Sequence, residues 1–303
     1  MNKTFAAIFL VFGFTSLLND VFAQNDTSQP SVNIERPVYK VNKGTTAAIS
    51  LIGTATNLWA IPNIIHNKRG LSDLELDALQ DQKKALNSFD RWALDLNPGN
   101  RDAFYKASDF TLPAFVAASG ISLLFDKKIK KDWVNVLLMY YEMHAITFNL
   151  YNFSFFGPNF QNRIRPFSYY NYFPREERKT GNQRNSMYSG HTANTAAATF
   201  FAVKVYSDYH PEIGKKKYLF YALASVPPLL EGYLRVKALA HFPSDNLIGF
   251  GIGAAMGIII PELHRINYRN IQVGINTSST TPELALRWTP EAGGKRLLPT
   301  FMD

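Results

Sequence analysis

The sequence predicts an all-α protein, a helical bundle of about six helices with a small β-hairpin near the C-terminus. Apolar stretches recur along the chain, and most exceed the roughly four to eight residues of a typical strand. Hydrophobic residues make up 46% of the 303 residues, which is enough for one large core. Segments of alternating polarity occur near the C-terminus, at 271–275 and 284–288, and these predict the hairpin.

The N-terminus has the layout of an export signal. Lys3 precedes an apolar run at 5–18, and Val21-Phe22-Ala23 follows, with smaller residues on either side of the phenylalanine. Residues 1–23 are therefore predicted to be a signal peptide, and 24–43 an extended leader. A short membrane anchor is the alternative reading, although the apolar run is shorter than the roughly 20 residues of a spanning helix.

Two helices are predicted upstream of the main apolar stretches. Residues 44–66 are apolar but dotted with Thr, Ser and Asn, and Pro62 is expected to interrupt the end of this helix. From Ser72 to Leu96, leucines and aromatic residues alternate with charges at near-helical spacing, which predicts one amphipathic helix. The Asn-Pro-Gly-Asn segment at 97–100 is expected to end that helix.

The remaining apolar stretches predict five more helices, at 110–125, 133–156, 192–206, 218–234 and 246–260. Together the helices predict one domain at 44–263, whose core is 110–263, followed by a tail at 264–303 that holds the hairpin.

Membrane embedding is compatible with the sequence but not required by it. The mean hydropathy is −0.14, and several of the helices contain charged residues. Lysine clusters at 127–131 and 215–217 lie two helices apart, so the positive-inside rule places both in the cytoplasm. The loops between the other helix ends would then face the periplasm. A crossing at 44–66 would put the loop at 67–109 on the wrong side, so that helix is predicted not to span.

Composition and charge limit the kinds of molecule that this protein is expected to bind. The formal net charge of +8 suits an anionic substrate or an anionic lipid surface. The sequence has no Gly-rich phosphate loop, no zinc-spaced Cys/His set and no RNA-binding aromatic signature, so nucleic acid is not expected as a partner. Cysteine is absent, which excludes disulfides, thiolate metal sites and cysteine nucleophiles.

Three short segments carry residues suited to phosphoryl transfer. They are Arg163-Ile164-Arg165-Pro166, Ser189-Gly190-His191, and Arg235 followed by His241 and Asp245. Phosphoryl transfer needs cations and backbone N–H groups around the phosphate oxygens, a nucleophile in line with the leaving group, and an acid. Singly each feature is more often structural, but their combination favours a site.

The first two segments predict phosphate binding and acid catalysis. Arg165 and Arg235 can bind phosphate oxygens in planar, bidentate fashion. Ser189 and Gly190 precede a predicted helix, so their hydroxyl and amide groups would face an anion at the helix N-terminus. His191 can protonate the leaving group near neutral pH.

The last segment predicts a nucleophile. His241 and Asp245 are four residues apart near a helix start, so both are expected on one face. A hydrogen bond from Asp245 would fix the imidazole tautomer and leave the other ring nitrogen free to attack phosphorus. Neither a metal ion nor another cofactor is expected.

These segments resemble the type 2 phosphatidic acid phosphatase (PAP2) superfamily, which includes class A acid phosphatases and vanadium haloperoxidases. The family pattern is K-x6-R-P, P-S-G-H and S-R-x5-H-x3-D, and the matching residues here are Arg165-Pro166, Ser189-Gly190-His191 and Arg235-x5-His241-x3-Asp245. The resemblance implies a helical phosphatase core in which His241 attacks phosphorus and His191 protonates the leaving group. It also implies that the phosphate is held by Arg165, Ser189, Gly190 and Arg235.

The chain departs from the family pattern at three positions: Pro158 for the lysine, Tyr188 for the proline and Leu234 for the serine. Loss of the lysine removes one positive charge from the phosphate site. We hypothesise that Arg163 supplies that charge and binds phosphate; Lys179 and Arg184 are the other candidates.

The function that the sequence favours is hydrolysis of a phosphomonoester or diphosphate in the bacterial cell envelope. A lipid phosphate is the favoured class of substrate. The expected partners are a lipid phosphate or a small phosphoester, together with the membrane. A soluble periplasmic acid phosphatase of broad specificity, a catalytically decayed envelope protein and a vanadate-dependent haloperoxidase are the alternatives.

Overall fold

The computed structural model describes residues 37–266, 271–276 and 283–288. The predicted signal peptide and most of the leader lie outside the described residues. The chain divides into two compact units after His264, and each unit is described by itself.

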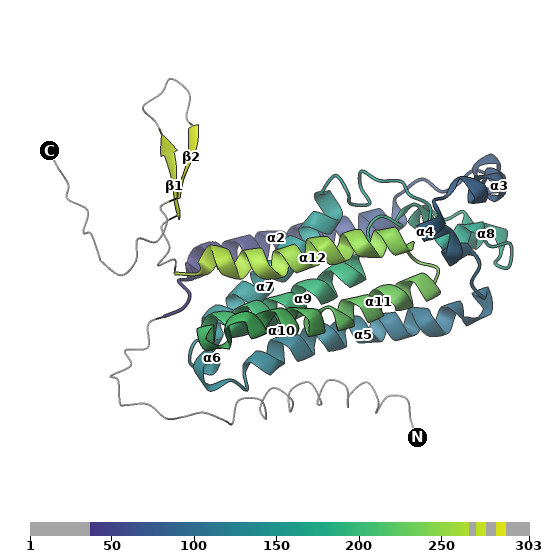
Figure 1. The fold of residues 1–303 in the computed structure, drawn as a ribbon. Helices are drawn as coiled ribbons and strands as arrows, with labels where there is room; N and C mark the ends of the chain where they lie inside the picture. The colour runs from purple at the N-terminus through teal and green to yellow at the C-terminus, as the bar shows by residue number, and fades with distance from the viewer. Residues whose placement is uncertain (1–36, 267–270, 277–282, 289–303) are drawn as a thin grey trace. The chain divides into compact units, whose positions relative to one another are not determined.

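The first unit is a helical bundle (Figure 1), as the sequence predicts. Among its described residues, six helices have twelve residues or more: α2 (Lys43–His66), α5 (Arg101–Leu123), α7 (Trp133–Phe153), α9 (Gly190–Tyr209), α11 (Val226–Lys237) and α12 (Pro243–His264). The shorter α-helices are α3 (Asp73–Gln82), α4 (Ser88–Arg91), α6 (Lys127–Lys131), α8 (Arg175–Arg178) and α10 (Lys217–Ala224). Six 3-10 turns connect them: η1 (Lys83–Ala85), η2 (Trp92–Leu94), η3 (Pro98–Asn100), η4 (Pro166–Tyr169), η5 (Gly181–Arg184) and η6 (Pro211–Lys216). Helices α3, α4 and α8 lie at one end of the bundle and α6 at the other (Figure 1).

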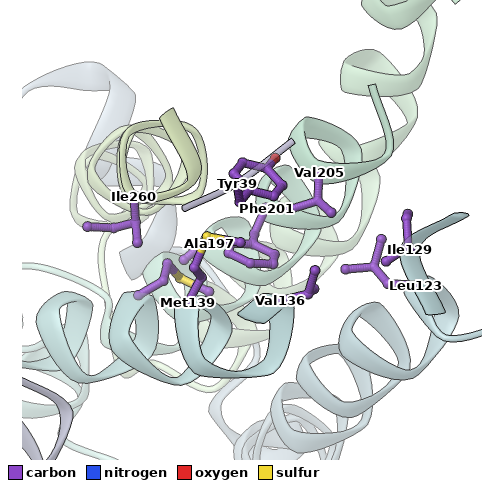
Figure 2. Packing of buried hydrophobic residues seen from close by; sticks show 10 residues of the cluster. Tyr39, Leu123, Ile129, Val136, Met139, Ala197, Phe201, Val205 and Ile260 are labelled. Carbon is purple, nitrogen blue, oxygen red and sulfur yellow. The ribbon is translucent and has the colours of Figure 1, made fainter. Parts of the chain in front are cut away.

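Helix α9 is the centre of this bundle. It packs against α5, α7, α10, α11 and α12, and 13 of its 20 residues are buried. A helix that is buried on all sides is a core helix rather than a surface one. Figure 2 shows Ala197 and Phe201 of α9 among the buried residues of one core cluster, with Met139 of α7 and Ile260 of α12. The bundle therefore fixes the position of the N-terminus of α9.

Helix α12 approaches α9 closely along a row of glycines. A Cβ atom on Gly249 would lie 2.5 Å from the Ser189 carbonyl oxygen, and one on Gly253 would lie 1.9 Å from that of Ala193. Both distances are far below van der Waals contact, so only glycine permits this backbone approach. The start of α12 is thereby held against the start of α9.

The structure corrects three helix predictions. Residues 72–96 do not form one helix, because Leu86 is extended and Asn87 caps a new helix, α4. The predicted helix at 218–234 is divided at Ser225, since two prolines follow that cannot donate backbone hydrogen bonds. Pro62 lies within α2, which continues to His66.

Two of the described helices, α2 and α12, are long and apolar enough to cross a membrane, judged by length and composition. Only 22% of the apolar window of α2 and 33% of that of α12 is buried inside the protein. The distribution of lysines predicts that 44–66 does not span the membrane. For α2, this charge argument therefore disagrees with the length and hydropathy of the helix.

The described part of the second unit is a β-hairpin, which confirms the sequence prediction. Strand β1 (Ile271–Asn276) pairs antiparallel with β2 (Glu283–Trp288), and Ile271 stands opposite Trp288.

Candidate active site

Backbone hydrogen bonds join the first two motif segments. The amide of Arg165 donates to the Gln183 carbonyl oxygen at 2.8 Å, and the amide of Ser186 donates to the Arg163 carbonyl oxygen at 3.0 Å. The segment at 163–165 therefore runs beside 183–186, three residues before Ser189.

Two further backbone bonds bring in the third segment. The Phe167 amide donates to the Leu239 carbonyl oxygen at 3.0 Å, and the Ser189 amide donates to that of Asp245 at 3.1 Å. Leu239 has a φ of 55°, a left-handed conformation that is unusual for leucine and bends the chain between α11 and His241. All three predicted segments thus meet at the N-termini of α9 and α12.

His241 is buried, with 2% of its surface exposed. Its Nδ1 lies 2.5 Å from the carbonyl oxygen of Ser186, which can only accept, so Nδ1 carries the proton. Nε2 is then unprotonated and available as a nucleophile. Burial, followed by repulsion from Arg165 and Arg235, lowers the pKa of His241 well below its ordinary value of 6.5 and keeps the ring neutral.

The Asp245 side chain does not make the contact with His241 that the sequence predicts. Its carboxylate accepts hydrogen bonds from the Ser186 hydroxyl at 2.6 Å and the Phe242 amide at 2.8 Å, and it pairs with Arg163. The predicted direct bond to His241 is not made, because α12 begins only at Pro243 and the helical four-residue spacing does not extend back to His241. Ser186 instead connects the two, through its hydroxyl to Asp245 and its carbonyl to His241.

Arg163 lies between two buried carboxylates. Its Nη2 is 2.7 Å from Asp90 Oδ2, and its Nη1 contacts Asp245 and the Ser244 hydroxyl. Asp90 also accepts the Ser244 amide at 2.9 Å at the start of α12. Both terminal nitrogens of Arg163 are therefore occupied, and in this arrangement it does not replace the missing phosphate-binding lysine as hypothesised.

Arg165 and Arg235 are buried neighbours of the same charge. Arg165 is 9% exposed, its Nε has no hydrogen-bond partner, and no partner is found for its side chain among the described residues. Arg235 is 2% exposed and donates through Nη1 to the Ser108 hydroxyl at 3.0 Å and to Asp109 at 3.4 Å. Burial and repulsion from Arg235 lower the pKa of Arg165. Two adjacent buried cations, one unpaired, form a site that favours an anion.

The start of α9 adds backbone donors to this site. The amides of Gly190 and His191 lie in the first helical turn, where N–H groups have no intrahelical partner. The Ser189 side chain caps the helix by accepting the Thr192 amide at 3.3 Å. A Cβ on Gly190 would lie 3.3 Å from the Tyr151 ring, so glycine lets that ring pack against the helix start.

His191 has a partner that the sequence did not reveal. Its Nε2 lies 3.2 Å from Oδ1 of Asp109, which projects from α5 and also contacts Arg235. Asp109 and Asp90 both come from upstream of the motifs, and neither belongs to a recognisable pattern. Among the described residues, no group of three or more His, Cys, Asp or Glu side chains is arranged to hold a metal ion.

The low pKa of His241 predicts activity in mildly acidic solution. If His241 is the nucleophile, its attacking form is the neutral imidazole, so a pKa depressed below 6.5 means that this form persists as the pH falls through 6.5 and is lost only at lower pH. We expect the acidic limb of kcat/KM, corrected for ionisation of the substrate, to lie below pH 6.5. A limb at or above that value in a pH–rate profile would contradict a neutral, buried nucleophile.

Comparison with known proteins relates part of the chain to a known family. The family model of the PAP2 superfamily matches residues 143–269. No curated protein matches the chain. A solved structure, the first transmembrane PAP2 type phosphatidylglycerolphosphate phosphatase from Bacillus subtilis, is 20% identical, with a TM-score of 0.39; the match covers 73% of this chain and 94% of that one. Residues 143–269, which carry all three motif segments, are therefore a PAP2 superfamily region, as the resemblance predicted.

Proposed function

We propose that this protein is a PAP2-type phosphatase that hydrolyses a phosphomonoester or diphosphate of a lipid through a phosphohistidine intermediate. The observation that carries the proposal is the unpaired, buried guanidinium of Arg165 beside Arg235 and the buried, neutral His241. A buried cation without a partner is costly, and a bound phosphate would supply the missing anion.

The geometry supports a two-step reaction. Nε2 of His241 attacks phosphorus while Nδ1 keeps its proton on the Ser186 carbonyl. The bond from phosphorus to the leaving oxygen breaks, and that oxygen takes a proton from His191. Burial and repulsion from Arg235 lower the pKa of His191 to about 4 in the free site, so this proton has to be stabilised by Asp109 and by the negative charge of the bound phosphate. Water then gives a proton to His191 and attacks the phosphohistidine, releasing inorganic phosphate and restoring Nε2. Arg165 and Arg235 neutralise the phosphate oxygens in both steps.

Exposed apolar side chains support a lipid substrate and a membrane location. Nine large hydrophobic residues that are at least 60% exposed lie on α2, α10, α11 and α12: Leu51, Ile52, Leu58, Trp59, Tyr218, Leu219, Leu229, Leu247 and Leu263. Five more lie on α3 or in connecting segments: Leu74, Phe125, Phe155, Phe160 and Tyr172. Such exposure is unfavourable in water but is matched by lipid hydrocarbon.

The charge distribution supports a site that faces the periplasm. Lys128 of the first lysine cluster lies 3.4 Å from the carbonyl oxygen of Tyr209, at the C-terminus of α9, whereas His191 lies at its N-terminus. The lysines and the site are thus at opposite ends of one helix of 20 residues, about 30 Å long. With the lysines in the cytoplasm, the site lies on the other side of the membrane.

Phosphate release from a panel of substrates tests the proposed function. The full-length protein in detergent would be given phosphatidic acid, phosphatidylglycerophosphate and an isoprenyl diphosphate in micelles, and p-nitrophenyl phosphate in solution. We expect kcat/KM to be about tenfold or more higher for one of the lipids, because its tail adds binding energy. Vanadate should inhibit the reaction.

Each of the other possible results would support one of the alternative functions. Faster turnover of the soluble ester would indicate an acid phosphatase of broad specificity. Vanadate-dependent halide oxidation would indicate a haloperoxidase, and no turnover of any substrate would indicate a site that has lost its activity.

A further inference from the structure

Lys68 lies in a short segment just after α2, outside the region that matches the PAP2 family model. Its Nζ donates hydrogen bonds to the carbonyl oxygen of Pro158, to that of Gln161 at 3.2 Å and to that of Arg184 at 3.4 Å. An ammonium group has three N–H donors, so three carbonyl oxygens use its full capacity. The side chain is half-buried, and all three of these partners belong to the backbone.

The partners of Lys68 belong to two loops that lead into the site. Pro158 and Gln161 precede Arg165 in the loop at 157–165, and Arg184 precedes the Ser-Gly-His segment. Pro158 is also the position at which the family pattern has its lysine. A single cation from a distant part of the chain thus links the loop that has lost the lysine to the segment that leads to His191 at the start of α9.

The segment at 67–71, which carries Lys68, is itself held firmly. The Leu71 amide donates to the Lys179 carbonyl oxygen at 2.8 Å, and Nε of Arg184 donates to the Arg69 carbonyl oxygen at 3.0 Å. A Cβ on Gly181 would lie 1.9 Å from the Lys68 carbonyl oxygen, so the two backbones are in close contact. The ammonium group is therefore presented by a fixed backbone and not by a free surface side chain.

The charge of Lys68 also reaches the phosphate site. Burial, then repulsion from Arg184 and Arg165, lowers the pKa of Lys68 to about 8. The group is therefore a cation at neutral pH, close enough to Arg165 to interact with it. Carbonyl oxygens, which carry partial negative charge, offset its repulsion from the two arginines.

We propose that Lys68 is a positioning residue of this site: by binding the carbonyl oxygens of Pro158, Gln161 and Arg184 it holds the loop at 157–165 so that Arg165 faces the phosphate. Its kinetic consequence rests on the proposed function, whereas its effect on the loop does not. Lys68 does not bind phosphate directly, because its donors are occupied.

Hydrogen–deuterium exchange and kinetics on the full-length protein test this role together. In Lys68→Met we expect faster exchange at 157–165, where the amide of Gln161 bonds to Gly157 and that of Arg165 to Gln183. We expect kcat/KM to fall by about 10- to 100-fold, since a displacement of about 1 Å can cost that much. Lys68→Arg, which keeps the charge and several donors, should recover part of both losses. Lys130→Met, at an exposed lysine of α6, which lies at the opposite end of the bundle from α4 (Figure 1), is the matched control and should change neither.

The two measurements separate failure of this proposal from failure of the proposed function. Unchanged exchange at 157–165 in Lys68→Met overturns the positioning role, whether or not the wild type has activity. Faster exchange with unchanged kcat/KM also overturns it, because the loop would then not control Arg165. If the wild type releases no phosphate, the proposed function fails while the exchange result still decides the role of Lys68. Should Lys68→Met not fold, Lys68→Gln, which retains two N–H donors without charge, is measured in its place.

Discussion

Replacement of His241 by alanine is expected to lower kcat/KM for phosphate release by about 10³-fold or more, because the covalent route disappears with its nucleophile. Arg165 and Arg235 remain in the variant, so substrate binding should be affected less than turnover. His241→Asn is the better-matched variant, since its amide can still donate to the Ser186 carbonyl oxygen but cannot attack phosphorus. His66→Ala, at an exposed histidine near the end of α2, should be unaffected.

Trapping the intermediate makes the His241 prediction specific. With a labelled substrate and an alkaline quench, the wild type should carry covalent phosphate and both His241 variants should not. Activity above about a tenth of the wild-type kcat/KM in a folded His241→Asn enzyme would rule out His241 as the nucleophile, since a lost nucleophile costs far more than tenfold.

The sequence predicted the parts of the site that depend on local structure. Ser189 caps α9 by accepting from the amide of Thr192, three residues away, and the amides of Gly190 and His191 are without intrahelical partners because they lie in the first helical turn. Helix α12 starts near the expected position, at Pro243, because proline is a favoured first residue of a helix; His241 lies in the loop before it and not, as the sequence predicts, on one helix face with Asp245. Short-range rules of this kind could be applied without knowing the fold.

The missing parts come from contacts between residues that are far apart in sequence. Arg163 and Asp90 are separated by 73 residues, His191 and Asp109 by 82, and Lys68 and Pro158 by 90. No periodicity or cap predicts which upstream side chain will reach the site. These residues could be assigned only once the packing of the segment at 67–109 against the core was known.

The role given to Arg163 shows how charge alone can mislead. A cation two residues before Arg165 was a reasonable replacement for a lost lysine, but the sequence could not show that two buried carboxylates, Asp90 and Asp245, compete for it. A guanidinium between two buried carboxylates neutralises them, and removing it would leave both charges uncompensated. Arg163 and Arg165 are therefore chemically alike and only two residues apart, but Arg163 lies between two carboxylates and Arg165 has no such partner.

This contrast leads to a paired prediction for Arg165 and Arg163. Arg165→Met should lower kcat/KM by about 10²- to 10³-fold, the usual cost of removing one group that stabilises charge in the transition state. It should not lower the melting temperature, because the guanidinium it removes is buried without a partner. Arg165→Lys should restore part of the activity, since it returns the charge without the bidentate geometry.

Arg163→Met should behave in the opposite way with respect to stability. It leaves Asp90 and Asp245 buried without their cation, so we expect the free energy of unfolding to fall by about 3 kcal/mol. Thermal unfolding of the two variants in the same detergent checks this pair. If Arg165→Met were destabilised as much as Arg163→Met, Arg165 would have a structural partner, and the unpaired cation on which the phosphate site depends would not exist. A phosphate site built on an unpaired arginine therefore requires that Arg165→Met loses activity but keeps its stability. Arg163→Met should lose stability.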